Sequence, residues 1–167
     1  ERMPNLRCIV LDKEESCLRI AQARGLEAVC ASVPEIPLKD DSVDIVLCLS
    51  VLEHIDEDER LISEIARVLK NESELILITP MKDGISFPFM SKRRSRQINL
   101  DWGHVRLGYS SDGIERLFNK GGFIVKEQIR YFNFLTRFIY RIAFLTKRPF
   151  IGSSALYGLA VQLEPYI

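Results

Sequence analysis

The 167-residue sequence has few of the features that mark metal sites, disulfide frameworks or membrane spans. Its four cysteines form no Cys-x-x-Cys pair and have no histidine at a metal-ligand spacing, so we expect buried, reduced thiols. No uncharged apolar run reaches the roughly 18 residues of a membrane-spanning helix. The polar, charged start shows no signal peptide. These absences predict a globular protein of the cytoplasm.

Glycine is missing where a nucleotide site would need it. "CIVLD" indicates a strand that ends on Asp12, and in nucleotide-binding α/β proteins a carboxylate at such a strand end commonly holds ribose hydroxyls. A glycine-rich turn is expected roughly 20 residues earlier, but no glycine precedes Asp12. Two interpretations stay open here: a cofactor site without its first half, or a strand-ending Asp that caps the next helix. The chain opens on "ERMPN" rather than on Met, so we expect an N-terminal truncation.

The net charge of zero hides an asymmetry between the two halves of the chain. Residues 1–81 hold 9 basic and 17 acidic residues, whereas residues 82–167 hold 14 basic and 6 acidic ones. The basic half could meet an anionic membrane surface, an acidic substrate or nucleic acid, or it could simply neutralise the first half. The protein could therefore contact a membrane surface, and we expect it not to bind nucleic acid.

Strand-like and helix-like segments alternate over the first 80 residues. The expected strands cover 8–12, 27–32, 43–50 and 73–80, and the expected helices cover 13–24 and 57–70. The third strand is apolar on both faces, which predicts a central strand covered on both sides. This alternation predicts a parallel sheet, with every strand C-terminus on the one edge where ligands bind in α/β folds.

The second half is harder to assign. Residues 81–108 are expected to be irregular, and we interpret 81–109 as a lid or substrate loop. Within it, "SKRRSR" (91–96) indicates a solvated loop or a contact with anionic headgroups or phosphate. A helix should run from Ser110 or Ser111 to Asn119. Strands are expected over 123–132 and 155–165, separated by a basic, aromatic segment that could lie on a membrane, pack on the sheet or form an oligomer interface.

Four stretches of the chain resemble a known family, the class I S-adenosylmethionine-dependent methyltransferases, and especially their type 11 branch. They are "IVLDKEESCLRIAQARGLEAV", the segment from "ASVPEIPLKDD" to "LILITP" with "VLEHI" inside it, "GHVRLGYSSDGIERLFNKGGFIV", and "ALYGLAVQLEP". The resemblance implies a Rossmann-like α/β fold with a mostly parallel twisted sheet, helices on both faces and an antiparallel C-terminal strand. It also implies that this chain lacks the family's first strand and glycine loop. Residues 1–167 would then form a single, N-terminally truncated domain.

The resemblance also assigns a cofactor site. Its positions are Asp12, Lys13, Ala31, Ser32, Val33, Leu49 and Ser50. Asp12 corresponds to the acidic residue that receives both ribose hydroxyls, for which two carboxylate oxygens are well suited. Ser32 stands where the family usually has an acidic residue that binds the adenine amino group. A serine hydroxyl accepts a hydrogen bond more weakly than a carboxylate does.

Candidate catalytic and substrate-binding residues come from two motifs. His54 in "LEHI" could act as a general base near neutral pH, or could be structural. His104 in "DWGHVRLGYS" is the second candidate. Trp102, Arg106 and Tyr109 would face the methyl acceptor. The aromatic rings would lie beside an apolar group of the acceptor, and Arg106 would bind an acid or a phosphate. The alternative is a polar hinge over the edge of the sheet.

The function expected from the resemblance is methyl transfer from S-adenosylmethionine to a small-molecule or lipid-like acceptor, with no metal. A non-catalytic scaffold that has lost the cofactor is the main alternative, and a nicotinamide-dependent oxidoreductase a weaker one. Without the family's first strand, the strands that normally flank it would be left unpaired. We therefore expect a rearranged sheet or a homodimer.

Overall fold

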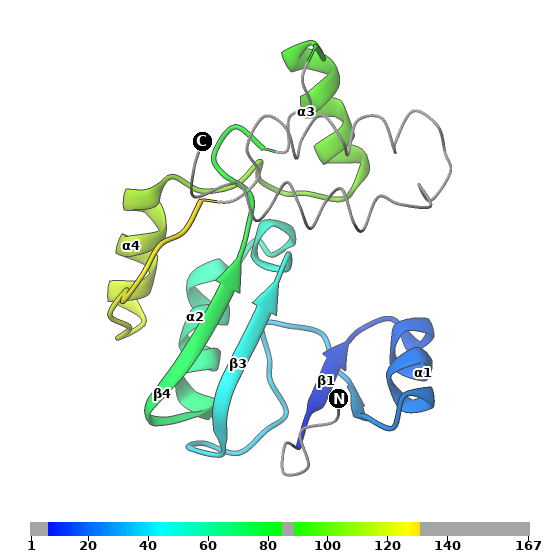
Figure 1. Ribbon diagram of the computed structural model, residues 1–167, viewed down its shortest axis with the longest axis vertical. Helices are drawn as coiled ribbons and strands as arrows, with labels where there is room; N and C mark the ends of the chain where they lie inside the picture. Colours follow the sequence, from blue (N-terminus) through cyan, green and yellow to red (C-terminus); the bar gives the residue numbers. More distant parts are fainter. Residues whose placement is uncertain (1–6, 85–88, 131–167) are drawn as a thin grey trace. The chain divides into compact units, whose positions relative to one another are not determined.

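The computed structural model describes residues 7–84 and 89–130 (Figure 1). They fall into two compact units, which are described separately. The first unit contains residues 7–78 and 120–123, and the second contains the remaining described residues between 79 and 130. The expected segments 133–148 and 155–165, including the predicted antiparallel strand, lie outside the described residues.

The first unit begins with a strand–helix–strand motif. Strand β1 (Ile9–Asp12) pairs in parallel with β2 (Glu27–Cys30), and helix α1 (Glu15–Ala23) connects them. The helix buries Leu18 and Ala21, and it ends just before Gly25, whose φ of +77° is the left-handed conformation that stops a helix. The predicted helix and glycine stop are confirmed.

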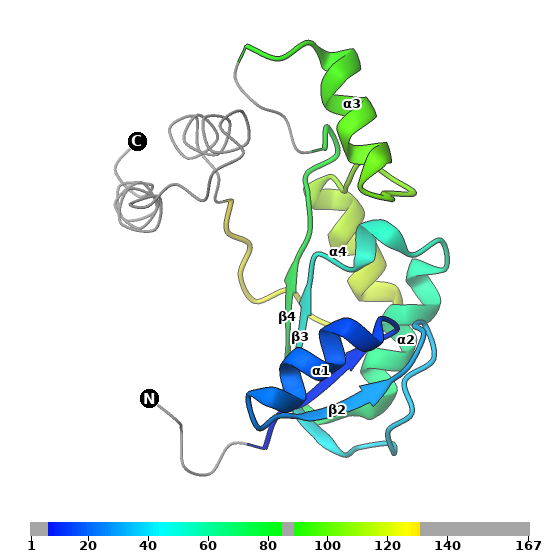
Figure 2. The ribbon, with the colours of Figure 1, turned by 90° about the vertical axis from the view of Figure 1, so that its right-hand side faces the viewer.

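A second strand–helix–strand motif completes this unit. Strand β3 (Val43–Leu49) leads through a short 3-10 helix, η1 (Leu52–His54), to helix α2 (Asp58–Val68) and strand β4 (Leu69–Ile78). Strands β3 and β4 are parallel. Helix α2 lies on one side of β3 and β4 (Figure 2), and its apolar residues are buried. Its buried residues are Leu61, Ile62, Ile65 and Val68.

The two motifs do not share a continuous sheet. Among the described residues, β1 pairs only with β2 and β3 only with β4, which gives two separate two-stranded sheets. Strands β1, β3 and β4 run in the same direction in Figure 1, so their carboxyl ends point the same way. The parallel, Rossmann-like α/β class is therefore confirmed, with an incomplete sheet.

The prediction that the third strand is covered on both faces is wrong. Ile45, Leu47 and Leu49 are 50%, 60% and 50% exposed, whereas Cys48 is buried. Successive side chains of a strand point to opposite faces, and α2 covers only the face that contains Cys48. Apolar side chains on both faces of β3 therefore do not mean that other elements cover both faces.

The second unit follows strand β4 in the sequence. Met81 and Tyr109 form a parallel bridge, so the two ends of the predicted insertion 81–109 pair with each other. Between them lies helix α3 (Lys92–Asp101), and beyond them α4 (Ser111–Lys120). The prediction of an irregular 81–108 is wrong, because α3 is a helix. Its buried residues, Ser95 and Asn99, are polar, so the segment has no apolar periodicity to reveal it.

Two further predictions are corrected. Residues 123–130 form no ladder with any other described segment, and Ile124 and Ile129 are 89% and 70% exposed, so the predicted strand is absent there. The cysteines are free, but only Cys48 is buried; Cys8, Cys17 and Cys30 are exposed. Strand-like sequence alone did not bury Cys8 and Cys30, because the short sheet of β1 and β2 leaves much of its surface open, and Cys17 lies on an exposed side of α1.

Candidate cofactor-binding edge

The side chain of Asp12 lies at the carboxyl end of β1. Its backbone oxygen accepts a hydrogen bond from the Ala31 N–H at 3.1 Å, which joins the ends of β1 and β2. Its carboxylate Oδ1 accepts from the Glu14 N–H at 2.8 Å. The second carboxylate oxygen has no hydrogen bond with any described residue. Asp12 thus orders the turn before α1 and keeps acceptor capacity for a ligand, since a carboxylate offers about four lone-pair sites.

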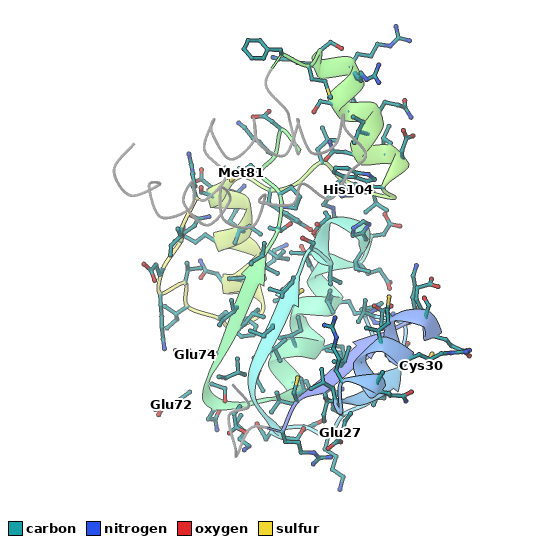
Figure 3. All side chains as sticks on the ribbon, turned by 45° about the vertical axis from the view of Figure 1, so that its right-hand side comes forward. Glu27, Cys30, Glu72, Glu74, Met81 and His104 are labelled. Carbon is teal, nitrogen blue, oxygen red and sulfur yellow. The ribbon has the colours of Figure 1, made fainter. Side chains whose placement is uncertain are left out.

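The end of β2 provides the next predicted positions. Ala31 and Val33 are half-buried, whereas Lys13 and Ser32 are exposed. The Cys30 Sγ lies 3.9 Å from the backbone oxygen of Lys13, which brings the end of β2 against the turn that follows Asp12 (Figure 3). The predicted residues of β1 and β2 are therefore neighbours at one sheet end.

The end of β3 has an unusual backbone. Ser50 adopts a φ of +53°, and its N–H donates to the Ile78 oxygen at 2.8 Å. A non-glycine residue in the left-handed region costs of order 1–3 kcal/mol, and such residues cluster at functional sites. This conformation turns the chain away from β4 and into η1, which contains the half-buried His54. Leu49, just before it, is half exposed.

Two residues that organise the loop after Ser32 were not predicted from the sequence. Arg67 on α2 donates to the backbone oxygens of Ile36 and Leu38, at 2.8 and 2.9 Å, and to the Asp40 carboxylate at 2.6 Å. It also forms two hydrogen bonds, at 2.8 and 2.9 Å, with Glu64. Its loop partners lie 27 to 31 residues away in the chain, so no local pattern could have identified them.

The same network shifts two ionisation equilibria. Hydrogen bonds from Arg67 and then from the Ile36 N–H lower the pKa of Glu64 to about 2. The hydrogen bonds to Glu64 and Asp40 raise the pKa of Arg67. Both side chains are only partly exposed, at 25% and 31%, so solvent screens the pair less than a surface pair.

Cys48 is excluded as a nucleophile in this unit. Burial, and then the nearby charge of Glu53, raise the pKa of its thiol to about 11. Because the thiolate is the reactive form, Cys48 stays protonated at neutral pH. It acts as a small apolar side chain between β3 and α2.

The second unit contains the predicted substrate residues. The rings of Trp102 and His104 are 6.1 Å apart, and His104 is buried. The Arg106 guanidinium lies 5.4 Å from the centre of the Tyr109 ring and donates a hydrogen bond to its hydroxyl. These four residues therefore form two neighbouring pairs.

Backbone contacts fix the position of this segment. The Tyr109 N–H donates to the Pro80 oxygen at 3.0 Å, and the Lys82 N–H donates to the Tyr109 oxygen at 2.9 Å. Gly108 has a φ of +149°, and a Cβ there would lie 2.2 Å from the Pro80 oxygen. Only glycine fits this close approach.

Part of the chain is similar in sequence to known proteins. A model described as "Methyltransferase domain" matches residues 2–77, a little under half of the chain. A protein of Methanocaldococcus jannaschii is 42% identical over 57 residues, which cover 34% of this chain and 25% of that protein. A Mycobacterium tuberculosis protein named "Probable S-adenosylmethionine-dependent methyltransferase" is 35% identical over 74 residues, covering 43% and 27%. The chain thus spans about a quarter of the length of these relatives.

A solved structure agrees. A SAM-dependent methyltransferase of Thermotoga maritima superimposes with a TM-score of 0.57 at 25% identity, covering 71% of this chain and 55% of that one. Residues 2–77 are therefore similar to the methyltransferase domain of the S-adenosylmethionine-dependent methyltransferases. The predicted resemblance is confirmed.

Proposed function

We propose that this chain forms part of an S-adenosylmethionine-dependent methyltransferase and holds the nucleoside half of the cofactor at the carboxyl edge of β1, β2 and β3. The observation that carries the proposal is the acceptor capacity left on Asp12 at the end of a parallel strand. Carboxylates at this position of α/β folds bind ribose hydroxyls. The names of the matched relatives support the same cofactor.

The donor set of this edge fits a nucleoside. Asp12 would hold both ribose hydroxyls, because charge-assisted hydrogen bonds to a carboxylate are short and strong. Ala31, Ser32 and Val33 would receive the adenine, with the Ser32 hydroxyl and backbone groups as polar partners. Leu49, which is half exposed, would cover the middle of the cofactor.

The chain would contribute to methyl transfer by positioning. The bound cofactor supplies an electrophilic methyl group on a sulfonium. Methyl displacement requires the acceptor in line with the reacting bond and water kept away. Arg67 acts before that step, because it fixes the loop that follows Ser32. We propose His54 as the group that removes a proton from the acceptor.

We propose a small-molecule or lipid-like acceptor. Trp102 and Tyr109 would offer aromatic surface to an apolar group, and Arg106 would offer a cation for an acid or phosphate. A role of His104 in catalysis stays a prediction.

Calorimetric titration with S-adenosylhomocysteine tests the proposal, using both this chain and a longer natural chain that contains it. The key variant is Asp12→Asn, whose amide oxygen can still accept from the Glu14 N–H but has no charge. We expect it to weaken binding by about 10- to 100-fold, since hydrogen bonds to charged groups contribute about 1.5–3 kcal/mol.

Asp44→Asn is the matched control. Asp44 lies at the opposite end of the strands, in β3, and pairs with Lys70 at 2.7 Å. It should leave binding unchanged. Failure of the longer chain to bind would favour a non-catalytic scaffold, whereas equal losses for both variants would show that Asp12 is not the ribose ligand.

His54→Gln separates the proton-transfer role from a structural one. If His54 is the base, kcat of the longer chain should fall at least tenfold while its affinity for S-adenosylhomocysteine stays the same. Loss of both together would indicate that His54 only supports η1.

A further inference from the structure

The most basic surface of the described chain is on helix α3. Four of its first five residues, Lys92, Arg93, Arg94 and Arg96, are exposed, and none forms an ion pair with any described residue. The helix has one acidic residue, Asp101, which accepts a hydrogen bond from Gln97 at 2.8 Å. Its positive charge is therefore not neutralised locally.

The helix is held on its opposite side by polar contacts. Ser95 and Asn99 are buried, and the Asn99 side chain donates to the Ser95 oxygen at 2.7 Å. The loop at Gly84 packs closely here, since a Cβ added to Gly84 would lie 2.9 Å from the Asn99 amide oxygen. This packing orients α3 and leaves its basic side open.

Apolar side chains are exposed beside these cations. Lys92, Arg96 and Leu100 follow each other at four-residue spacing and so share one side of the helix. Leu100 is 50% exposed. Phe89, just before the helix, is 82% exposed. We define Phe89, Lys92, Arg93, Arg96 and Leu100 as the α3 surface.

We propose that the α3 surface docks the protein on an anionic lipid bilayer. Interfacial helices combine Lys and Arg with Phe, Leu or Trp, because headgroups attract the cations while apolar side chains enter the acyl boundary. A folded acidic partner or a nucleic acid duplex would engage the cations but has no general need for Phe89 and Leu100. The exposed apolar residues therefore favour a bilayer as the occupant.

Vesicle co-sedimentation of the full chain tests this proposal. We expect binding to vesicles of phosphatidylcholine mixed with phosphatidylglycerol, weakened by salt, and little binding to phosphatidylcholine alone. The double variant Arg93→Glu/Arg96→Glu should reduce the vesicle-bound fraction about tenfold or more, and Arg93→Gln/Arg96→Gln should reduce it less. Circular dichroism would verify that each variant folds.

Two control variants keep the test specific. Arg24→Glu/Arg116→Glu makes the same change in net charge at exposed positions outside the α3 surface, and it should alter binding less than twofold. Phe89→Ser should weaken binding, whereas Ile124→Ser, which removes another exposed apolar side chain, should not.

Several outcomes would overturn the proposal. Equal binding to neutral vesicles would show that charge does not contribute to docking. Equal losses in Arg93→Glu/Arg96→Glu and Arg24→Glu/Arg116→Glu would show that binding does not depend on α3. Tighter binding to a DNA duplex than to anionic vesicles, unaffected by Phe89→Ser, would make the α3 surface a polyanion site instead. Cofactor binding is measured separately, so failure here leaves the proposed methyl transfer standing.

Discussion

Single residues at strand ends determine which polar groups the first unit presents at its sheet edge. Asp12 accepts a hydrogen bond from the turn that follows it and still has acceptor capacity. Its carboxylate bonds to the N–H of the N-cap residue Glu14 rather than to an N–H within α1, so it orders the turn without capping the helix, and ribose binding stays a prediction. Ser50 contributes a left-handed turn that redirects the chain into η1.

Gly108 makes a specific prediction in the second unit. Gly108→Ala should destabilise the bridge between Met81 and Tyr109 by about 3 kcal/mol or more, because the new Cβ would overlap backbone oxygens. Hydrogen exchange of the Lys82 and Tyr109 amides would measure this loss locally.

Gly122→Ala is the control for backbone conformation. Gly122 has a φ of +82° but no atom within 4 Å of an added Cβ. We expect a cost of only about 1 kcal/mol, from left-handed strain alone. Similar exchange rates in both variants would show that the close approach at Gly108 has no energetic effect.

Among the secondary-structure elements, α2 does more than cover β3 and β4. Its outer side carries Glu64 and Arg67, which fix the loop between β2 and β3. This loop starts at the end of the strand where the adenine is proposed to bind. Helix α2 therefore couples the stability of the unit to the order of the site.

The ionisation of Glu64 predicts a pH dependence. Its pKa of about 2 lies below the ordinary value of 4.5, so the unfolded chain takes up this proton first as the pH falls. The stabilisation is present above about pH 4.5 and is lost progressively as the pH approaches 2. Urea unfolding between pH 6 and pH 2.5 should show this loss in the native chain and a shallower one in Glu64→Gln.

Glu115→Gln is the matched control, since Glu115 is exposed and has no described partner. It should keep the native pH dependence. Arg67→Lys should lower the free energy of unfolding by about 1–3 kcal/mol, because lysine has no planar fork for Glu64 and the loop carbonyls. An unchanged pH profile in Glu64→Gln would refute this account.

At the scale of the molecule, the described strands expose apolar surface that parallel sheets normally cover. Ile45, Leu47 and Leu49 of β3, together with Ile76 of β4, are about half exposed. Purely parallel sheets are almost always covered on both faces. Sequence reasoning expected a rearranged sheet or a dimer; the described strands form two sheets, and the dimer stays a prediction.

Two solution measurements probe this apolar surface. We expect the surface to bind an apolar fluorescent dye, and we expect the chain to self-associate with rising concentration in sedimentation velocity. Leu47→Lys should reduce both effects at a small cost in stability, below about 1 kcal/mol, because Leu47 is 60% exposed. Leu61→Ala, at a buried position, should cost about 2–5 kcal/mol. Dye binding unchanged by Leu47→Lys would place the apolar surface elsewhere.

The sequence predicted the first half of the fold better than the second. The periodic apolar residues of α2 and the glycine stop after α1 are local signals, and both elements were found near their predicted bounds. Helix α3 was missed because its buried side is polar. The strand expected over 123–132 needed a partner that no described segment provides, and a strand sequence cannot show whether one exists.

The sequence by itself determined the parallel strand–helix–strand motifs and the position of Asp12 at a strand end, because these depend on periodicity and spacing along the chain. The tertiary structure alone decided which face of β3 is covered, how Arg67 fixes a loop some 30 residues away, and that the cations of α3 lie exposed beside Phe89 and Leu100. Such features depend on contacts between residues distant in sequence, and local patterns contain no record of them.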